Sequence, residues 1–170
     1  MIRNSELKKD SPTLGIIDAK SIKNADTAKE KGYDAGKKVS GIKLHIIVDT
    51  LGLPQAIHVS CANVTDRNSA LEMIKCNLNY LSEIEKYLVD GGYSGANFAN
   101  AVKLLQNAEV EVVKRNELHH FAVLPKRWIV ERSFGWLDKY RRLWKNCEHM
   151  LSISLQMTVL AFVSILIRRF

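Results

Sequence analysis

Three acidic residues stand where they could do chemistry together: Asp18, Asp90 and Glu131. Asp18 ends the apolar run Leu14-Gly-Ile-Ile, and Asp90 ends the run Lys86-Tyr-Leu-Val. Ligands of open sheets bind beyond the carboxyl ends of the strands, so two neighbouring strands would place both carboxylates in one crevice. Glu131, an isolated acid among Lys and Arg residues, could complete that crevice from a helix. Three carboxylates without Cys or His form an oxygen-rich site that suits Mg²⁺ or Mn²⁺.

Such a site could support phosphoryl transfer. Two divalent ions a few ångströms apart can activate an attacking oxygen and stabilise the leaving oxygen of a phosphodiester. Each aspartate also has a simpler interpretation, since an aspartate after a strand commonly forms a turn. This applies to Asp49 as much as to Asp18. The residue types alone leave both interpretations open.

The basic charge of the chain is concentrated around Glu131. The 170 residues carry a net charge of +7, and the segment 114–145 alone has nine Lys or Arg against three acids. A local basic surface is typical of proteins that meet phosphate groups. The alternative is a mixed-sign helix face that is simply solvated. A surface that only holds phosphate gains nothing from a carboxylate at its centre, which favours a site for phosphate and metal together.

A helix is predicted over residues 125–145. Helical periodicity places a charged stripe of Arg127, Glu131, Asp138 and Arg142 opposite an apolar side. The apolar side comprises Ile129, Trp136, Leu137, Tyr140, Leu143 and Trp144. The three tryptophans are therefore expected in the core rather than as base-stacking platforms, although Trp128 falls near the charged stripe.

The other elements indicate an α/β fold. Five strands are predicted, over 14–18, 41–49, 55–60, 86–90 and 109–114, with helices over 67–81 and 96–107. Three strands followed by strand–helix alternation imply a mixed sheet with helices on its faces. The stretch 24–40 is expected to be a loop or long hairpin connection, and Asp66 to cap the helix that follows it. The histidines are expected on sheet faces (His45, His58) or in a surface loop (His119, His120), not as metal ligands.

Size and composition favour one domain in a reducing cytoplasm. The chain is 46% hydrophobic, and its three cysteines form no CxxC pair. Both a disulfide framework and a zinc site are therefore disfavoured. Residues 1–13 are expected to be a flexible lead-in to a domain over 14–170. The segment 150–170 is apolar enough to suggest a membrane span, but its Ser, Thr and Gln residues favour a helix packed against the sheet.

Five motifs resemble one family in sequence and in order. They are Ile16-Ile-Asp-Ala-Lys-Ser-Ile-Lys, Gly32-Tyr-Asp-Ala-Gly-Lys-Lys, Val48-Asp-Thr-Leu-Gly-Leu, Leu88-Val-Asp-Gly-Gly-Tyr-Ser-Gly and Leu124-Pro-Lys-Arg-Trp-Ile-Val-Glu-Arg-Ser-Phe-Gly-Trp-Leu. The chain resembles the DDE transposases of bacterial insertion sequences, specifically the insertion sequence five branch. The resemblance implies a ribonuclease H-like fold and a catalytic, metal-binding triad of Asp18, Asp90 and Glu131 with two Mg²⁺ or Mn²⁺ ions. Members of the family cut DNA at transposon ends with water and join the free 3′-hydroxyl to a target strand.

The implied partner is double-stranded DNA, both transposon ends and target, bound by a homodimer in the bacterial cytoplasm at the nucleoid. Candidate phosphate contacts are Lys20, Lys23, Arg127, Arg132, Lys139, Arg141 and Arg142.

Two departures from the family pattern stand out. The wider group has a signature of Tyr, two residues, Arg, three residues, Glu, six residues, Lys. Arg127 and Glu131 match it, but Leu124 takes the tyrosine position and Asp138 the lysine position, so that Lys139 comes one residue late. Members also carry a DNA-binding region before the first catalytic strand, so the chain is expected to be the catalytic portion alone. The alternative is a truncated, non-catalytic DNA-binding or regulatory remnant, which would need no metal.

Overall fold

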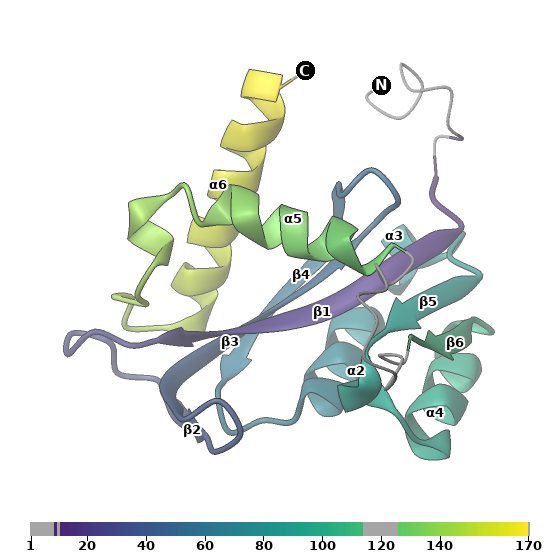
Figure 1. Ribbon diagram of the computed structural model, residues 1–170, viewed down its shortest axis with the longest axis horizontal. Coiled ribbons are helices and arrows are strands. Elements are labelled where there is room, and N and C mark those ends of the chain that lie inside the picture. The colour runs from purple at the N-terminus through teal and green to yellow at the C-terminus, as the bar shows by residue number, and fades with distance from the viewer. Residues whose placement is uncertain (1–8, 10, 114–125, 170) are drawn as a thin grey trace, which may run out of the picture.

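A mixed sheet of six strands forms the centre of the molecule (Figure 1). The structure is a computed structural model that describes residue 9 and residues 11–113 and 126–169. In chain order the strands are β1 (Leu14–Lys23), β2 (Gly32–Asp34), β3 (Val39–Val48), β4 (Pro54–Cys61), β5 (Lys86–Val89) and β6 (Glu109–Val112). β3 pairs antiparallel with β1 on one edge and with β2 and β4 on the other. β5 pairs parallel with β1 and with β6, which gives the order β4–β3–β1–β5–β6 with β2 beside the start of β3.

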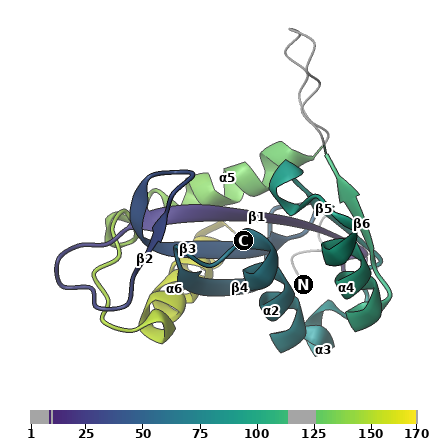
Figure 2. The ribbon, with the colours of Figure 1, turned by 90° about the horizontal axis from the view of Figure 1, so that it is seen from below.

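Two hydrophobic clusters cover the opposite faces of this sheet. Because successive side chains of a strand point to opposite faces, Ile17 and Ile47 belong to one cluster and Ile16 and Ile46 to the other. The helices are α2 (Asp66–Cys76), α3 (Leu78–Leu81), α4 (Ala96–Gln106), α5 (Arg127–Leu137) and α6 (Leu151–Arg169). The first cluster includes residues of α2, α3 and α4, and the second includes residues of α5 and α6. Figure 2 shows α5 on one side of β1 and α2, α3 and α4 on the other.

All five predicted strands are present, and the structure adds β2. This strand lies in the stretch 24–40, which the sequence predicts as a loop or hairpin connection. Its three residues pair with the start of β3, and Asp34 accepts a hydrogen bond from the Ser21 hydroxyl at 2.8 Å. Three residues are too few to show the period of a strand in the sequence. β2 is held in place by pairing and by this side-chain contact rather than by an apolar pattern.

The two middle helices differ in detail from the prediction. Thr65, not Asp66, caps α2, since its side chain accepts from the Asn68 N–H at 3.3 Å. Asp66 instead pairs with the Lys43 ammonium at 2.9 Å. The predicted helix over 67–81 is divided into α2 and α3 at Asn77, whose side-chain amide donates to the Met73 carbonyl and replaces a helical bond there.

The predicted helix over 125–145 is shorter than its periodicity suggests. α5 ends at Leu137, and after Asp138 the chain turns into a 3-10 turn, η2 (Arg141–Leu143). Ile129 and Leu137 are buried as expected, whereas Trp128 is 47% and Trp144 61% exposed. The expectation that these two tryptophans lie in the core is wrong, because Trp128 faces away from the sheet and Trp144 lies beyond the end of the helix.

α6 packs against the sheet, as its Ser, Thr and Gln residues predict. Ala161 and Phe162 are buried in the cluster that also holds Ile46 and Phe134. Within the described residues, α6 is also the one helix long and apolar enough to cross a membrane, by length and composition alone. Such a match is weak evidence for a span, since a helix that contributes to a core passes the same test. The inner face of α6 packs against the sheet.

The buried histidine of β3 is a sheet-face residue, as predicted. His45 is fully buried, and its Nε2 lies 3.1 Å from the Ser60 hydroxyl. Burial lowers the pKa of His45 to about 3. The predicted loop with His119 and His120 lies outside the described residues.

Candidate active site beside β1, β5 and α5

Asp18 lies within β1 rather than at its end. β1 continues to Lys23 by pairing with β3, whereas its parallel pairing with β5 extends no further than Ile16 and Leu88. The shorter strand predicted from the apolar run is therefore corrected, because β3 holds the polar continuation of β1. Asp18 still stands just past the point where two neighbouring strands part, which is where ligands bind in open sheets.

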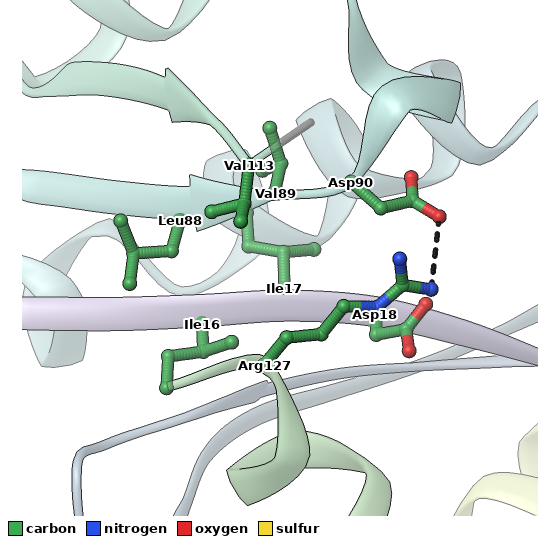
Figure 3. A pocket seen from close by; sticks show the side chains of 8 residues that line it. All are labelled: Ile16, Ile17, Asp18, Leu88, Val89, Asp90, Val113 and Arg127. Atoms are coloured by element: carbon green, nitrogen blue, oxygen red, sulfur yellow. Dashed lines mark hydrogen bonds and ion pairs between the residues drawn. The ribbon is translucent and has the colours of Figure 1, made fainter. Parts of the chain in front are cut away.

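Asp90, the first residue after β5, projects to the same face of the sheet as Asp18. Asp18 follows Ile16 by two residues, and Asp90 follows Leu88 by two. Ile16 and Leu88 both belong to the cluster under α5. Alternation therefore directs both carboxylates toward α5, and Figure 3 shows them projecting toward the same guanidinium.

Arg127, in the first turn of α5, links two of the three acids. Its Nη2 lies 3.4 Å from Asp90 Oδ2, and its Nε lies 3.5 Å from Glu131 Oε1. Asp90 is also tied to its own turn, since its Oδ1 accepts the Gly92 N–H at 2.9 Å. All three acids thus lie on the α5 side of the sheet, with an arginine between Asp90 and Glu131.

The acids are near one another without converging on a single point. Within residues 11–113 and 126–169, no three acidic, His or Cys side chains lie close enough together to hold a metal ion. Glu131 is the most open of the triad, its side chain 61% exposed. The donor set is nevertheless all oxygen, and it fits a hard divalent cation such as Mg²⁺ or Mn²⁺ rather than zinc.

The environment of Asp18 disfavours its charged form. The pKa of Asp18 is raised from 3.8 to about 6, chiefly by burial and to a smaller extent by the neighbouring Asp90, against the effect of a hydrogen bond from the Ala19 N–H at 2.8 Å. Arg127 and Lys37 act in the opposite direction. A carboxylate that is costly to charge, beside a second acid, is a common property of metal and catalytic sites.

Two residues that were not among the predicted ones interact with the acids, Lys37 and Tyr93, although Tyr93 belongs to the cluster on the opposite face of the sheet from α5. Lys37 donates to the Ala19 carbonyl at 3.2 Å, and its charge acts on Asp18. Tyr93 is 1% exposed, and among the described residues its hydroxyl has no hydrogen-bond partner. Burial raises the pKa of Tyr93 well above 10, with smaller effects from Asp66, Asp18 and Asp90. The sequence signals were the lysine pair after Gly36 and the tyrosine three residues after Asp90.

Three of the predicted phosphate contacts are available on the surface. Lys23, Lys139 and Arg141 are exposed. Among the described residues, no side-chain hydrogen bond or ion pair is found for any of them. These three side chains can meet an external anion without first breaking a contact within the protein.

Two other predicted contacts are held in surface ion pairs. Lys20 pairs with Asp138, the residue at the lysine position of the signature. Arg142 donates through Nε and Nη2 to Glu148 Oε1 at 3.1 and 2.8 Å. Surface pairs of this kind are weak, so an incoming phosphate could replace the carboxylate partner.

Arg132, a predicted phosphate contact, is engaged in contacts within the protein. Its Nη2 donates to the Leu51 carbonyl in the β3–β4 turn at 2.8 Å. Its guanidinium lies 4.7 Å from the ring centroid of Trp128 and 5.2 Å from that of Trp136. Arg132 therefore anchors α5 to the β3–β4 turn, and we leave it out of the proposed phosphate contacts.

Asp49 illustrates the simpler interpretation of a strand-end acid. It is fully buried, and its Oδ1 accepts the N–H groups of Leu51 and Leu53 at 2.8 and 2.9 Å. These bonds form the turn between β3 and β4, where Gly52 has a φ of 81°. Asp49 is a turn former, whereas Asp18 lies on the α5 side of the sheet, where three charged groups act on it: Asp90, Arg127 and Lys37.

The fold is shared with the catalytic cores of retroviral integrases. The chain matches the catalytic core domain of BIV integrase with a TM-score of 0.53 at 12% identity, over 91% of this chain and 83% of the other. It matches the HTLV-2 integrase catalytic core domain with a TM-score of 0.51 at 14% identity, over 89% and 86%. A chain of the simian T-cell lymphotropic virus intasome, in complex with PP2A regulatory subunit B56 gamma, matches with a TM-score of 0.57 at 17% identity, over 88% and 48%. The architecture is therefore ribonuclease H-like, as the motifs imply.

The sequence identifies the family within this fold. The profile of the family described as "Transposase DDE domain" matches residues 9–166. A Burkholderia cepacia protein assigned as the transposase for insertion sequence element IS402 is 30% identical over 110 residues, 61% of this chain and 52% of that protein. The chain belongs to the DDE transposase domain family, and it spans about half the length of this curated relative. The resemblance to the transposases of insertion sequences is confirmed.

Proposed function

We propose that residues 14–170 form the catalytic domain of a transposase that cleaves and joins DNA strands at insertion-sequence ends. The observation that carries the proposal is the direction of Asp18 and Asp90, which point from neighbouring strands to the α5 side, where Arg127 connects Asp90 to Glu131. Family membership and the integrase-like fold support the same conclusion.

In this proposal Asp18, Asp90 and Glu131 hold two Mg²⁺ or Mn²⁺ ions. When bound, the ions supply Lewis-acid stabilisation of the attacking and leaving oxygens of a phosphodiester. The chain itself positions the ligands: Asp18 is oriented by the Ala19 N–H, and Asp90 by the Gly92 N–H. In the cleavage step, a water oxygen forms a bond to phosphorus as the P–O3′ bond breaks, which leaves a 3′-hydroxyl. In the joining step, that hydroxyl attacks a phosphodiester of the target strand in the same way.

The DNA partner is supported by the basic surface beside the acids. Lys23, Lys139 and Arg141 are exposed, and Lys20 and Arg142 could exchange their carboxylate partners for phosphates. Contacts of this type give affinity without reading sequence, and they weaken as salt rises. We propose double-stranded DNA as the substrate, a homodimer as the form bound to it, and the cytoplasm, at the nucleoid, as the location.

The test uses strand cleavage and metal binding together. Purified chain is incubated with a labelled duplex carrying the ends of the element and with Mn²⁺, and its thermal unfolding is followed with and without the metal. We expect Asp18→Asn, Asp90→Asn and Glu131→Gln each to abolish cleavage and reduce Mn²⁺ stabilisation while DNA affinity changes little. Glu83→Gln, an exposed acid ahead of β5 and away from the site, is the control and should behave as wild type.

The result also decides between an enzyme and a DNA-binding remnant. Cleavage that persists in all three variants would remove these acids from the mechanism. Salt-sensitive DNA binding without any Mn²⁺ effect would make the chain a DNA-binding protein without catalysis.

A further inference from the structure

We propose that Arg127 is an internal counter-ion that competes with the divalent metal for Asp90 and Glu131, so that binding of DNA and of metal are coupled through this one side chain. The inference rests on the proposed function, because it takes these acids as the metal ligands. It adds a role that neither the fold nor family membership supplies: an arginine that must leave the acids before they can share an ion.

The contacts of Arg127 place its guanidinium between the two acids. Nη2 faces Asp90 at 3.4 Å and Nε faces Glu131 at 3.5 Å. For both carboxylates to ligate one ion, at the short distances of about 2.0–2.6 Å that Mg²⁺ or Ca²⁺ requires, they must approach across the space that the guanidinium fills. The two positive groups would also repel each other there. Arginine and metal therefore exclude each other.

The surroundings of Arg127 leave little room for both. The cavity in Figure 3 is lined by Asp18, Asp90, Arg127, Val113 and apolar residues of β1 and β5, and its volume is about 10 Å³. Such a volume accommodates about one water molecule. The cavity can widen if the guanidinium swings outward.

Arg127 is held loosely enough to move. Its two ion-pair distances are longer than the roughly 2.7–2.9 Å of a tight charge-assisted hydrogen bond, and its side chain is 25% exposed. Arg132 on the same helix is the contrast, since it donates to Leu51 at 2.8 Å and its guanidinium contacts two tryptophan rings. Of these two arginines, Arg127 is the one that can exchange partners.

A phosphate group is the natural alternative partner for the released guanidinium. The planar fork of arginine matches two phosphate oxygens as well as it matches a carboxylate. DNA that binds Arg127 would free the acids for metal, and metal that binds the acids would free Arg127 for DNA. Linkage requires the two effects to be equal in size.

The experiment measures Mn²⁺ affinity by the paramagnetic resonance signal of free Mn²⁺, with the full chain at low salt, with and without a duplex of about 20 base pairs. Without DNA, Arg127→Gln should bind Mn²⁺ roughly two- to thirtyfold more tightly than wild type, the range expected for the loss of two weak ion pairs. The gain in Mn²⁺ affinity on adding DNA should shrink by the same factor. Lys37→Gln is the matched control. Lys37 acts on Asp18 through its charge, but among the described residues it forms no hydrogen bond or ion pair with Asp90 or Glu131. It should change Mn²⁺ affinity less and keep the full DNA-dependent gain.

Two results would overturn the inference. Arg127→Gln could bind Mn²⁺ no more tightly than Lys37→Gln, or it could keep the whole DNA-dependent gain. If Asp90→Asn still abolishes Mn²⁺ binding in either case, the inference alone has failed. If wild type and Asp90→Asn bind Mn²⁺ equally, the proposed metal site has failed, and the inference fails with it.

Discussion

The ionised Asp18 carboxylate should reduce the stability of the fold in the absence of metal, and Asp18→Asn should remove that cost. The pKa of Asp18 rises from 3.8 to about 6 on folding. The two values differ by roughly two, and each pKa unit corresponds to about 1.4 kcal/mol, so the upper bound is about 3 kcal/mol. The carboxylate is not fully enclosed, and solvent screens part of the cost. We therefore expect Asp18→Asn to unfold at a higher urea concentration at pH 8, with a gain of about 1–3 kcal/mol.

The sign of the pH dependence follows from proton binding. Between about pH 4 and pH 6 the native state binds more protons at Asp18 than the unfolded state, so the stability contributed by this residue falls as pH rises through that window. Below about pH 4 the side chain is neutral in both states, and wild type and Asp18→Asn should have equal stability. Above about pH 6 the difference in free energy of unfolding between wild type and Asp18→Asn should reach its full size.

The assay is urea unfolding at pH 4 and pH 8 in EDTA, followed by circular dichroism. Asp49→Asn is an informative comparison, because Asp49 accepts two backbone N–H groups in a turn and its replacement should destabilise at pH 8. Equal stability of wild type and Asp18→Asn at both pH values would refute the argument that burial of this carboxylate is costly. In the absence of EDTA, added Mn²⁺ should stabilise wild type and leave Asp18→Asn unchanged. The stability that Asp18→Asn gains would therefore come with a loss of metal binding.

Two further predictions separate structural from DNA-binding side chains. Arg132→Ala should destabilise the fold by about 1–3 kcal/mol, because the variant loses the hydrogen bond to Leu51 and the stacking on Trp136. Its affinity for DNA should be nearly unchanged. A large loss of DNA affinity in a folded variant would show that Arg132 contacts phosphate after all. Arg141→Ala should leave the urea midpoint unchanged and reduce the slope of log DNA affinity against log salt concentration by about one. An unchanged slope would show that Arg141 does not contact phosphate. Phe162→Ala should cost about 3–5 kcal/mol if α6 is part of the core, and an unchanged urea midpoint would contradict the packing of α6 against the sheet.

The sequence contained enough to predict the strands and the face on which the acids lie. β3 is apolar and β-branched over most of its length, and this local pattern survives in the structure because the strand is buried on both sides. Asp18 and Asp90 each lie two residues after an apolar residue of the α5-side cluster, and the two-residue period of a strand carries that face forward. The proposed triad was therefore accessible from local patterns and from the resemblance to transposases.

Other features depended on partners far along the chain. The break after Leu137 is invisible to helical periodicity, which continues through Tyr140 and Leu143. Both of these residues still pack on the same cluster from outside the helix. The capping role of Thr65 was missed because Asp66 is an equally good cap by residue type, and only the ion pair with Lys43 shows why it is used elsewhere.

Sequence alone determined the local elements of this protein, because strand and helix periods are written in residues a few positions apart. Tertiary structure decided which of those elements are neighbours. Arg127 and Asp90 are 37 residues apart in the chain, and their contact exists only because α5 packs over β1 and β3 and brings its first turn beside the residue that follows β5. The arginine that the sequence offered as a contact for DNA is thereby also a contact for Asp90, since packing brings these two opposite charges together. Its contact with Glu131, four residues further along the same helix, follows from helical periodicity.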